Sequence, residues 1–120
     1  MSESETQDGI VYCTYENFEK IKLRVAEVIA AECHPKADKL LKLQIKVGDK
    51  QKQICAGIRS YYTPESLIGK RIIIIDNLEP RMLRGEVSEG MLLAATDAVS
   101  GKVILLTTDD PETSSGSAVR

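Results

Sequence analysis

A polar and basic segment interrupts two apolar runs near the middle of the chain. It reads Asp76-Asn77-Leu78-Glu79-Pro80-Arg81-Met82-Leu83-Arg84-Gly85, and Ser88-Glu89-Gly90-Met91 follows closely. The apolar residues 72–75 and 92–95 on either side predict buried strands, so we expect a loop held between two rigid elements, where binding residues are commonly found. Two arginines, an amide side chain and glycines that allow close approach suit an anionic, hydrogen-bonding partner such as a nucleic-acid backbone.

The side chains of this segment also have structural interpretations. We expect the guanidinium groups of Arg81 and Arg84 to bind phosphates, whereas the alternative is surface arginines that pair with Glu79 or Glu86. We expect Asn77 to hydrogen-bond a base edge or a ribose, whereas the alternative is that it caps its own turn.

Ser88 and Met91 are expected to contact a nucleotide from the rim of a barrel, Met91 through its apolar side chain. The alternative for Met91 is that it fills space in the core. His34, beside Cys33, has no second histidine and no nearby ligand pair, so we expect it neither to bind a metal nor to act as a nucleophile.

The distribution of charge supports an anionic partner although the net charge is −2. Residues 20–84 carry a net charge of +7, whereas residues 1–19 carry −5 and residues 85–120 carry −4. Alternation places Lys42, Gln44 and Lys46 on one face of a strand, so these lysines, with Lys36 and Lys39, predict a basic track along one sheet face. The alternative is an ordinary solvated strand face.

The composition fits one compact domain. With 120 residues, 42% of them hydrophobic, the chain leaves little room for a second domain. No apolar stretch approaches the roughly 20 residues of a membrane helix, and the start MSESETQDG lacks the features of a signal peptide, so we expect a cytoplasmic protein without membrane contact. Three widely separated cysteines predict reduced thiols.

Motifs for catalysis are absent from the sequence. It contains no phosphate loop, no GxSxG and no HExxH, and we therefore expect no catalytic site, no metal and no cofactor.

The pattern of apolar residues predicts an all-β fold with a short helix. A phase slip near Glu27 predicts a β-bulge in the first strand, and a hairpin follows around Gly48. Thr14 predicts the cap of a helical turn over residues 15–18. Thr63, Pro64 and Gly69 mark the start and end of a short helix before a strand over 71–76. Further strands are expected over 91–96 and 102–107, and an extended tail over 109–120. Together they predict a five-stranded Greek-key OB-fold barrel with an extra C-terminal strand; a generic small β-barrel is the alternative.

Two long segments carry a family resemblance. They are FEKIKLRVAEVIAAECHPKADKLLKLQIKVGD and QICAGIRSYYTPESLIGKRIIIIDNLEPRMLRGEVSEGMLLAA. The chain resembles the tRNA-binding domain family, which includes free-standing structure-specific tRNA-binding proteins and the β-subunit or C-terminal domain of methionyl-tRNA synthetases. The resemblance runs from about Phe18 to the C-terminus and implies a tRNA-binding OB-fold domain, to which we assign residues 15–120. Because the start of the chain has no stable pattern, we expect a flexible lead-in over residues 1–14.

The resemblance also implies a set of binding residues. Positions that match the family's binding positions are Arg24, Lys39, Lys42, Asn77, Arg81, Ser88 and Met91, and Arg59 and Arg84 are basic where the family varies. Departures from the family pattern are Lys22, where an acidic residue is usual, Asp76, where alanine is usual, and Glu79 and Met82, where lysine is frequent. We expect these departures to weaken the affinity for tRNA.

The function implied by the resemblance is non-catalytic binding of tRNA by its shape and backbone, with or as part of a methionyl-tRNA synthetase. A homodimer is also implied, and the late apolar residues Val103, Ile104 and Leu105 are either dimer contacts or core. The alternative function is that of the related CsaA-type secretion chaperones, which bind unfolded polypeptide in an apolar groove.

Overall fold

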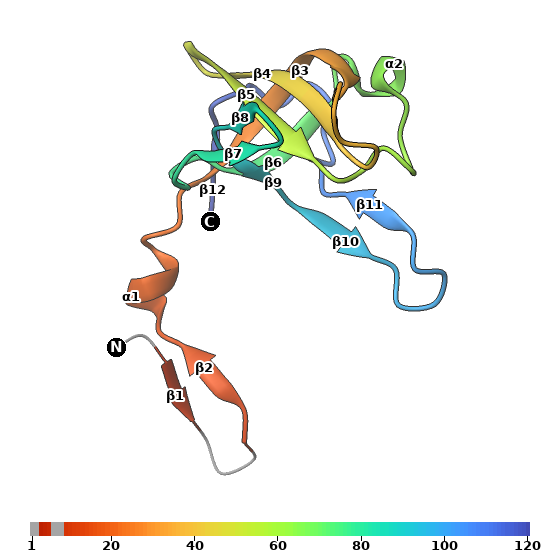
Figure 1. Cartoon of the computed structure of the whole chain (residues 1–120). Coiled ribbons are helices and arrows are strands. Elements are labelled where there is room, and N and C mark those ends of the chain that lie inside the picture. Colours follow the sequence, from red (N-terminus) through yellow and green to blue (C-terminus); the bar gives the residue numbers. More distant parts are fainter. Residues whose placement is uncertain (1–2, 6–8) are drawn as a thin grey trace.

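A curled antiparallel sheet forms the body of the protein. The computed structural model describes residues 3–5 and 9–120 (Figure 1). Neighbouring strands in the main sheet run in the order β5 (Lys50–Ala56), β4 (Leu41–Val47), β3 (Leu23–Cys33), β6 (Arg71–Ile75) and β9 (Met91–Leu92), and β12 (Ala118–Val119) pairs with the start of β3. These elements confirm the predicted mostly-β, OB-like barrel.

A bulge in β3 bends the sheet. The first half of this strand pairs with β6 and its later half with β4, and the register with β4 shifts between Val28 and Ala30. Val25, Ala26 and Val28 are all buried, which a regular alternation of side chains does not allow. The phase slip in the sequence therefore predicted the bulge correctly.

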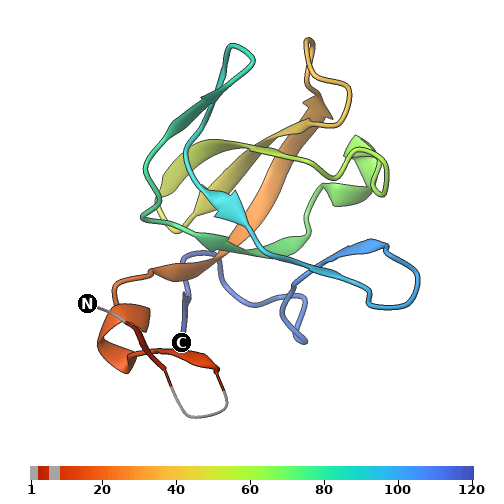
Figure 2. The same ribbon diagram turned by 60° about the horizontal axis from the view of Figure 1, so that its bottom comes forward.

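The curl brings β5 near the last strands of the sheet. The Glu89 amide donates to the Gln53 carbonyl at 2.8 Å, and the Gln53 amide donates to Oε1 of Glu89 at 3.0 Å. In Figure 2 the sheet wraps around in this way into a partial barrel.

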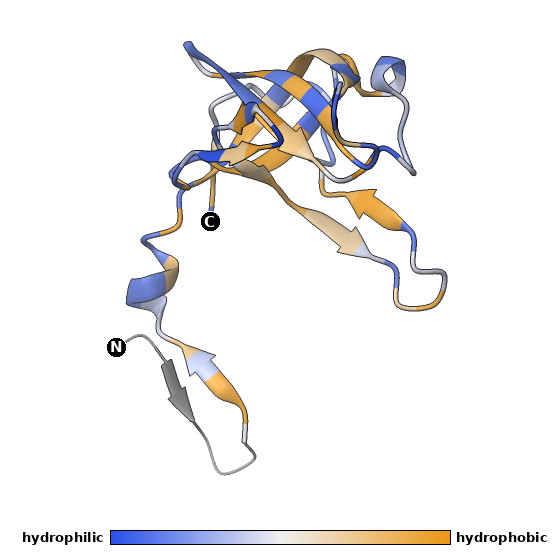
Figure 3. Cartoon of the chain, viewed as in Figure 1, coloured by the Kyte–Doolittle hydropathy of each residue, from blue (hydrophilic) through white to orange (hydrophobic). Residues whose placement is uncertain are grey.

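Apolar side chains fill the interior of the barrel. Figure 3 shows hydrophobic and hydrophilic residues alternating along its strands. The largest fully buried side chains are Val25, Val28, Leu41, Leu43, Ile45, Ile54, Leu67, Ile72 and Ile74. Because successive residues of a strand face opposite sides, the intervening lysines and glutamines face outward.

Two short helices begin at the threonines that the sequence indicates. Thr63 caps α2 (Pro64–Leu67), accepting from the Ser66 amide at 3.3 Å, and Leu67 is fully buried against the barrel. Thr14 caps α1 (Tyr15–Phe18) in the same way at 3.2 Å. In Figure 1, α1 stands away from the barrel.

Two strand pairs lie outside the main sheet. β1 (Glu3–Glu5) pairs with β2 (Val11–Cys13), so part of the lead-in predicted over residues 1–14 is paired, and residues 1, 2 and 6–8 lie outside the described residues. The predicted strand over 91–96 is divided into β9 and β10 (Ala94–Thr96), and β10 pairs with β11 (Val103–Leu105). In Figure 1 the β10–β11 hairpin extends from the barrel.

The segment expected to be a loop after β6 contains a hairpin, which is a correction to the sequence prediction. β7 (Arg81–Leu83) pairs with β8 (Glu86–Ser88). Between them Arg84 has φ 52° and Gly85 has φ 89°, as in the tight two-residue turns that match the twist of a hairpin.

No helix within residues 3–5 and 9–120 is long and apolar enough to cross a membrane.

Candidate nucleic-acid interface

The β7–β8 hairpin is fastened to the loop after β3 by a buried histidine. His34 is 2% exposed, and its Nε2 lies 2.8 Å from the carbonyl oxygen of Leu83. Its Nδ1 accepts from the Lys36 amide at 2.9 Å, which leaves the proton on Nε2 for donation to Leu83. In Figure 2 the hairpin and the loop rise from the same side of the barrel. The imidazole therefore has a structural role.

An open cleft of about 350 Å³ lies beside this hairpin. Most of its wall is apolar, and the lining comprises Leu40, Cys55, Ala56, Gly57, Leu78, Glu79, Arg81, Leu83, Ser88, Gly90, Met91 and Leu92. Burial raises the pKa of the Cys55 thiol, and the Glu86 carboxylate raises it further. Because a thiol with a raised pKa stays protonated at neutral pH, Cys55 adds a neutral surface to the wall.

Four exposed cations lie in or next to the segments that line the cleft. Arg81 is part of its lining, and Arg84 is at the tip of the hairpin. Lys39 precedes the lining residue Leu40, and its carbonyl accepts from the Arg59 amide at 3.4 Å, which places these two residues side by side. Among the described residues, none of the four side chains forms an ion pair.

The alternative interpretation, in which Arg81 or Arg84 pairs with Glu79 or Glu86, does not hold among the described residues. Glu86 instead faces Lys42 and Gln53. Glu79 lines the cleft, is exposed, and forms no ion pair with any described residue. The two arginines are therefore available to a ligand.

Lys42 does not contribute to a free basic track. Its side chain is 16% exposed, and its Nζ lies 2.9 Å from Glu32 and 3.5 Å from Glu86. The hydrogen bond to Glu32 raises the pKa of Lys42, so the amine stays charged but is neutralised locally. The prediction of a phosphate contact by Lys42 conflicts with this arrangement, because two carboxylates already neutralise its amine, Glu32 on the paired strand β3 and Glu86 on β8.

Arg24 is similarly engaged within the protein. Its Nη1 donates to the carbonyl oxygen of Gly116 at 3.2 Å, which ties the C-terminal segment to β3. The residue is half-buried and pairs with Ala118 of β12. Arg24 is not among the residues that line the cleft.

Asn77 joins the segment after β6 to the segment before β3. Its Oδ1 accepts from the Lys22 amide at 2.9 Å, and its Nδ2 donates to the Lys20 carbonyl at 2.7 Å. Both the oxygen and the nitrogen of the side-chain amide therefore bind backbone groups of another segment, and Asn77 does not cap its own turn. No contact to a base edge is needed to explain the residue.

Replacing Asn77 with alanine should lower the free energy of unfolding by about 1–2 kcal/mol, because two backbone groups are left without their partners. Chemical denaturation of the variant measures this change, and Asn17→Ala in α1 is a matched control that should stay within about 0.5 kcal/mol. A drop in tRNA affinity at unchanged stability would instead place Asn77 at the RNA.

Ser88 is directed into the protein, whereas Met91 is exposed. The Ser88 side chain is 5% exposed; its hydroxyl accepts from the Cys55 amide and donates to the Gly90 carbonyl, each at 3.0 Å. The single hydroxyl proton is already donated within the protein, so the predicted nucleotide contact by Ser88 is restricted to the remaining acceptor lone pair of its hydroxyl. Met91 is 43% exposed in the cleft wall, so the predicted apolar contact remains available.

Several residues of this site are not indicated by the sequence. Leu40, Leu78 and Gly57 belong to the cleft only because three separate segments meet there. His34 is the single histidine of the chain, and nothing in the sequence around it indicates that its ring binds the distant Leu83 carbonyl. Asp76, a departure from the family pattern, forms an ion pair of 2.7 Å with Lys52.

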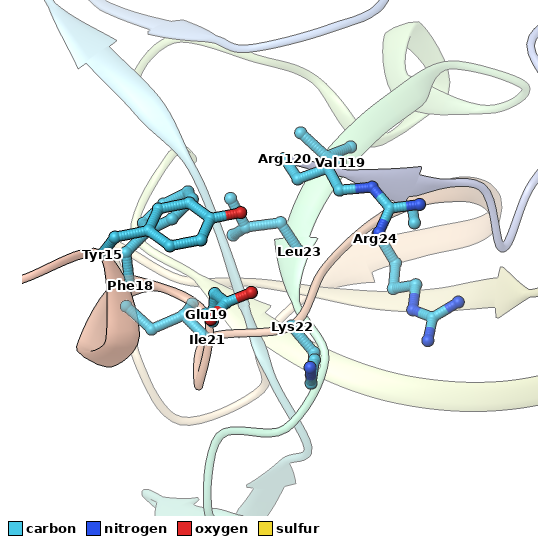
Figure 4. Close-up of a pocket in the computed structure, with 10 residues that line it drawn as sticks. Tyr15, Phe18, Glu19, Ile21, Lys22, Leu23, Arg24, Val119 and Arg120 are labelled. Atoms are coloured by element: carbon cyan, nitrogen blue, oxygen red, sulfur yellow. The ribbon is translucent and has the colours of Figure 1, made fainter.

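A second, smaller hollow of about 170 Å³ lies between α1 and β12. Figure 4 shows Tyr15 and Phe18 of α1 on one side and Val119 on the other. The two aromatic rings are 6.4 Å apart, and Tyr15 is 70% exposed. The hollow is separate from the cleft, because Lys39, Arg59, Arg81 and Arg84 do not line it.

Comparison with known proteins identifies the family. The profile of the putative tRNA binding domain matches residues 23–117. A methionine–tRNA ligase from Caldanaerobacter subterraneus subsp. tengcongensis is 53% identical over 86% of this chain, which spans only 16% of that relative's length.

Solved structures agree with this assignment. A MetRS-related protein from Pyrococcus horikoshii superposes with a TM-score of 0.84 at 33% identity, covering 91% of this chain and 98% of that one. A CsaA chaperone from Bacillus anthracis gives a TM-score of 0.80 at 30% identity, with 91% and 99% covered. The profile match extends over most of the chain, and this protein belongs to the tRNA-binding domain family.

Proposed function

We propose that the chain is a non-catalytic tRNA-binding module that contacts RNA with the cleft side of the barrel. The observation that supports this proposal is the group of four exposed cations without an acidic partner, Lys39, Arg59, Arg81 and Arg84, around the cleft of a tRNA-binding family member. Phosphate contacts by such cations bring most of the affinity and release counterions, so binding should weaken as salt increases.

We propose further that the module acts with a methionyl-tRNA synthetase, or as part of one, in the cytoplasm. The curated relatives are methionine–tRNA ligases, of which this chain resembles a small part. By increasing the affinity for tRNA, such a module would increase the time that the substrate spends near a synthetase.

The test is a titration of a labelled, folded tRNA by fluorescence anisotropy across a salt series, with an unstructured RNA of equal length as competitor. The proposal expects preferential binding of folded tRNA that weakens with salt. Absence of binding to either RNA at low salt would contradict it.

The alternative function is peptide binding, as in the CsaA chaperones. The apolar wall of the cleft and the likeness to the B. anthracis structure favour this alternative. Affinity for an unfolded polypeptide would survive added salt, because apolar contacts do not depend on counterions. The salt series therefore separates the two functions.

We also propose a homodimer. Of the three late apolar residues, Leu105 is 9% exposed in the core and Val103 packs against it, but Ile104 is 48% exposed. Sedimentation should show a dimer at micromolar concentration, and Ile104→Lys should produce monomers because a charge in an apolar interface is costly. A wild-type protein that stays monomeric at high micromolar concentration would contradict the dimer.

A further inference from the structure

We propose that the cleft binds one unpaired, amino-bearing nucleobase of the RNA, which adds a base-specific contact to the recognition of shape and backbone. This inference rests on the proposed function. It concerns a different part of the ligand, because phosphates account for the cations but not for the apolar wall between them.

The shape of the cleft suits one base. A volume of about 350 Å³ is at the small end of ligand pockets, which span roughly 300–1,000 Å³, and a duplex does not fit. Leu40, Leu78 and Met91 line it from three different segments, and the last two are 37% and 43% exposed. Apolar surface left open to water in this way can pack against the face of a base.

The charges around the cleft match a nucleotide rather than an apolar peptide. Arg81 lines the cleft, so a base inserted there would bring its own phosphate close to the guanidinium group. Lys39 and Arg59 lie side by side next to other parts of the lining and can bind a neighbouring phosphate. An unfolded polypeptide has no regular array of anions to pair with these cations.

Glu79 gives the cleft a preference among bases. An exposed carboxylate in a phosphate-binding site is unfavourable unless it contacts a donor, and Glu79 has no cationic partner among the described residues. A carboxylate accepts hydrogen bonds from the exocyclic amino groups of cytosine and of the purines, whereas uracil has none. Glu79 is thus assigned as the specificity residue of the cleft.

The first test compares two variants of the same residue type. Met91→Ser removes an apolar wall of the cleft, whereas Met82→Ser changes an even more exposed methionine, 69% exposed, that does not line it. Met91→Ser should weaken tRNA binding roughly tenfold with an unchanged salt slope, since a stacking contact does not release counterions. Met82→Ser should leave affinity within about twofold. Equal effects of the two variants would overturn the proposal.

The second test uses single-stranded RNA octamers of cytidine and of uridine, which differ at the amino group. Cytidine should bind roughly fivefold more tightly, and Glu79→Ala should abolish this preference. Equal binding of the two octamers by the wild type would overturn the assignment of Glu79.

The outcomes distinguish this inference from the proposed function. If wild-type protein binds tRNA and Arg81→Ala weakens that binding while Met91→Ser does not, the function stands and the base contact fails. If reduced, carboxymethylated lactalbumin displaces tRNA and Met91→Ser weakens only the polypeptide, the cleft is a peptide site and the proposal is overturned.

Discussion

Replacing Arg81 and Arg84 together with alanine should lower the affinity for folded tRNA roughly 100-fold at low salt. Each guanidinium group is exposed and has no acidic partner among the described residues, so it can form charge-assisted bonds to phosphate, which contribute about 1.5–3 kcal/mol each. The slope of log affinity against log salt should become shallower by about two, one for each phosphate that the variant no longer binds. Anisotropy titrations over a salt series measure both quantities.

The control for this prediction removes the same charge elsewhere. Lys70 and Lys102 are exposed and do not line the cleft, so Lys70→Ala with Lys102→Ala should change affinity only a few-fold. Both double variants should keep the free energy of unfolding within about 1 kcal/mol, because surface substitutions rarely cost more. Equal decreases of affinity in the two double variants would show that net charge, rather than the cleft, determines binding.

Replacing His34 with alanine should lower the free energy of unfolding by about 2–4 kcal/mol. The substitution leaves a cavity at a side chain that is 2% exposed, and it removes the partners of the Lys36 amide and the Leu83 carbonyl. Because Leu83 belongs to the strand that carries Arg81, tRNA affinity should also fall. Urea unfolding and tRNA titration measure the two effects, and amide exchange over residues 81–88 should become faster.

Two conservative variants of His34 distinguish its hydrogen bond to the hairpin from its role in filling space. Glutamine can donate from a position close to that of Nε2 and so retain the bond to Leu83, whereas asparagine retains only an acceptor for the Lys36 amide. His34→Gln should therefore keep more tRNA affinity than His34→Asn, although both are less stable than the wild type. Equal affinities of the two variants would mean that the histidine acts only by filling space.

The position of the candidate cleft was indicated by the sequence, and binding of RNA there stays a prediction. The segment from Asp76 to Met91 does contain the hairpin and much of the cleft lining, and Arg81 and Met91 lie where a ligand can reach them. The sequence did not indicate which of the other expected binding residues have side chains that remain free. Ser88 is buried, Lys42 is neutralised and Asn77 binds backbone, although all three occupy positions matched to the family's binding residues.

Sequence patterns alone indicated the main strands of the barrel, the bulge of β3, the caps of the two short helices and the basic middle of the chain, but not the β7–β8 hairpin. These features depend on residues that are neighbours in the sequence, such as Thr63 and Ser66, so periodicity and composition reveal them. Which polar groups remain free depends instead on contacts between residues far apart in the sequence. Asn77 and Lys22 are 55 positions apart, His34 and Leu83 are 49 apart, and Cys55 and Ser88 are 33 apart. A side chain is available to a ligand only when no such distant partner satisfies it, and that condition is set by how the sheet curls.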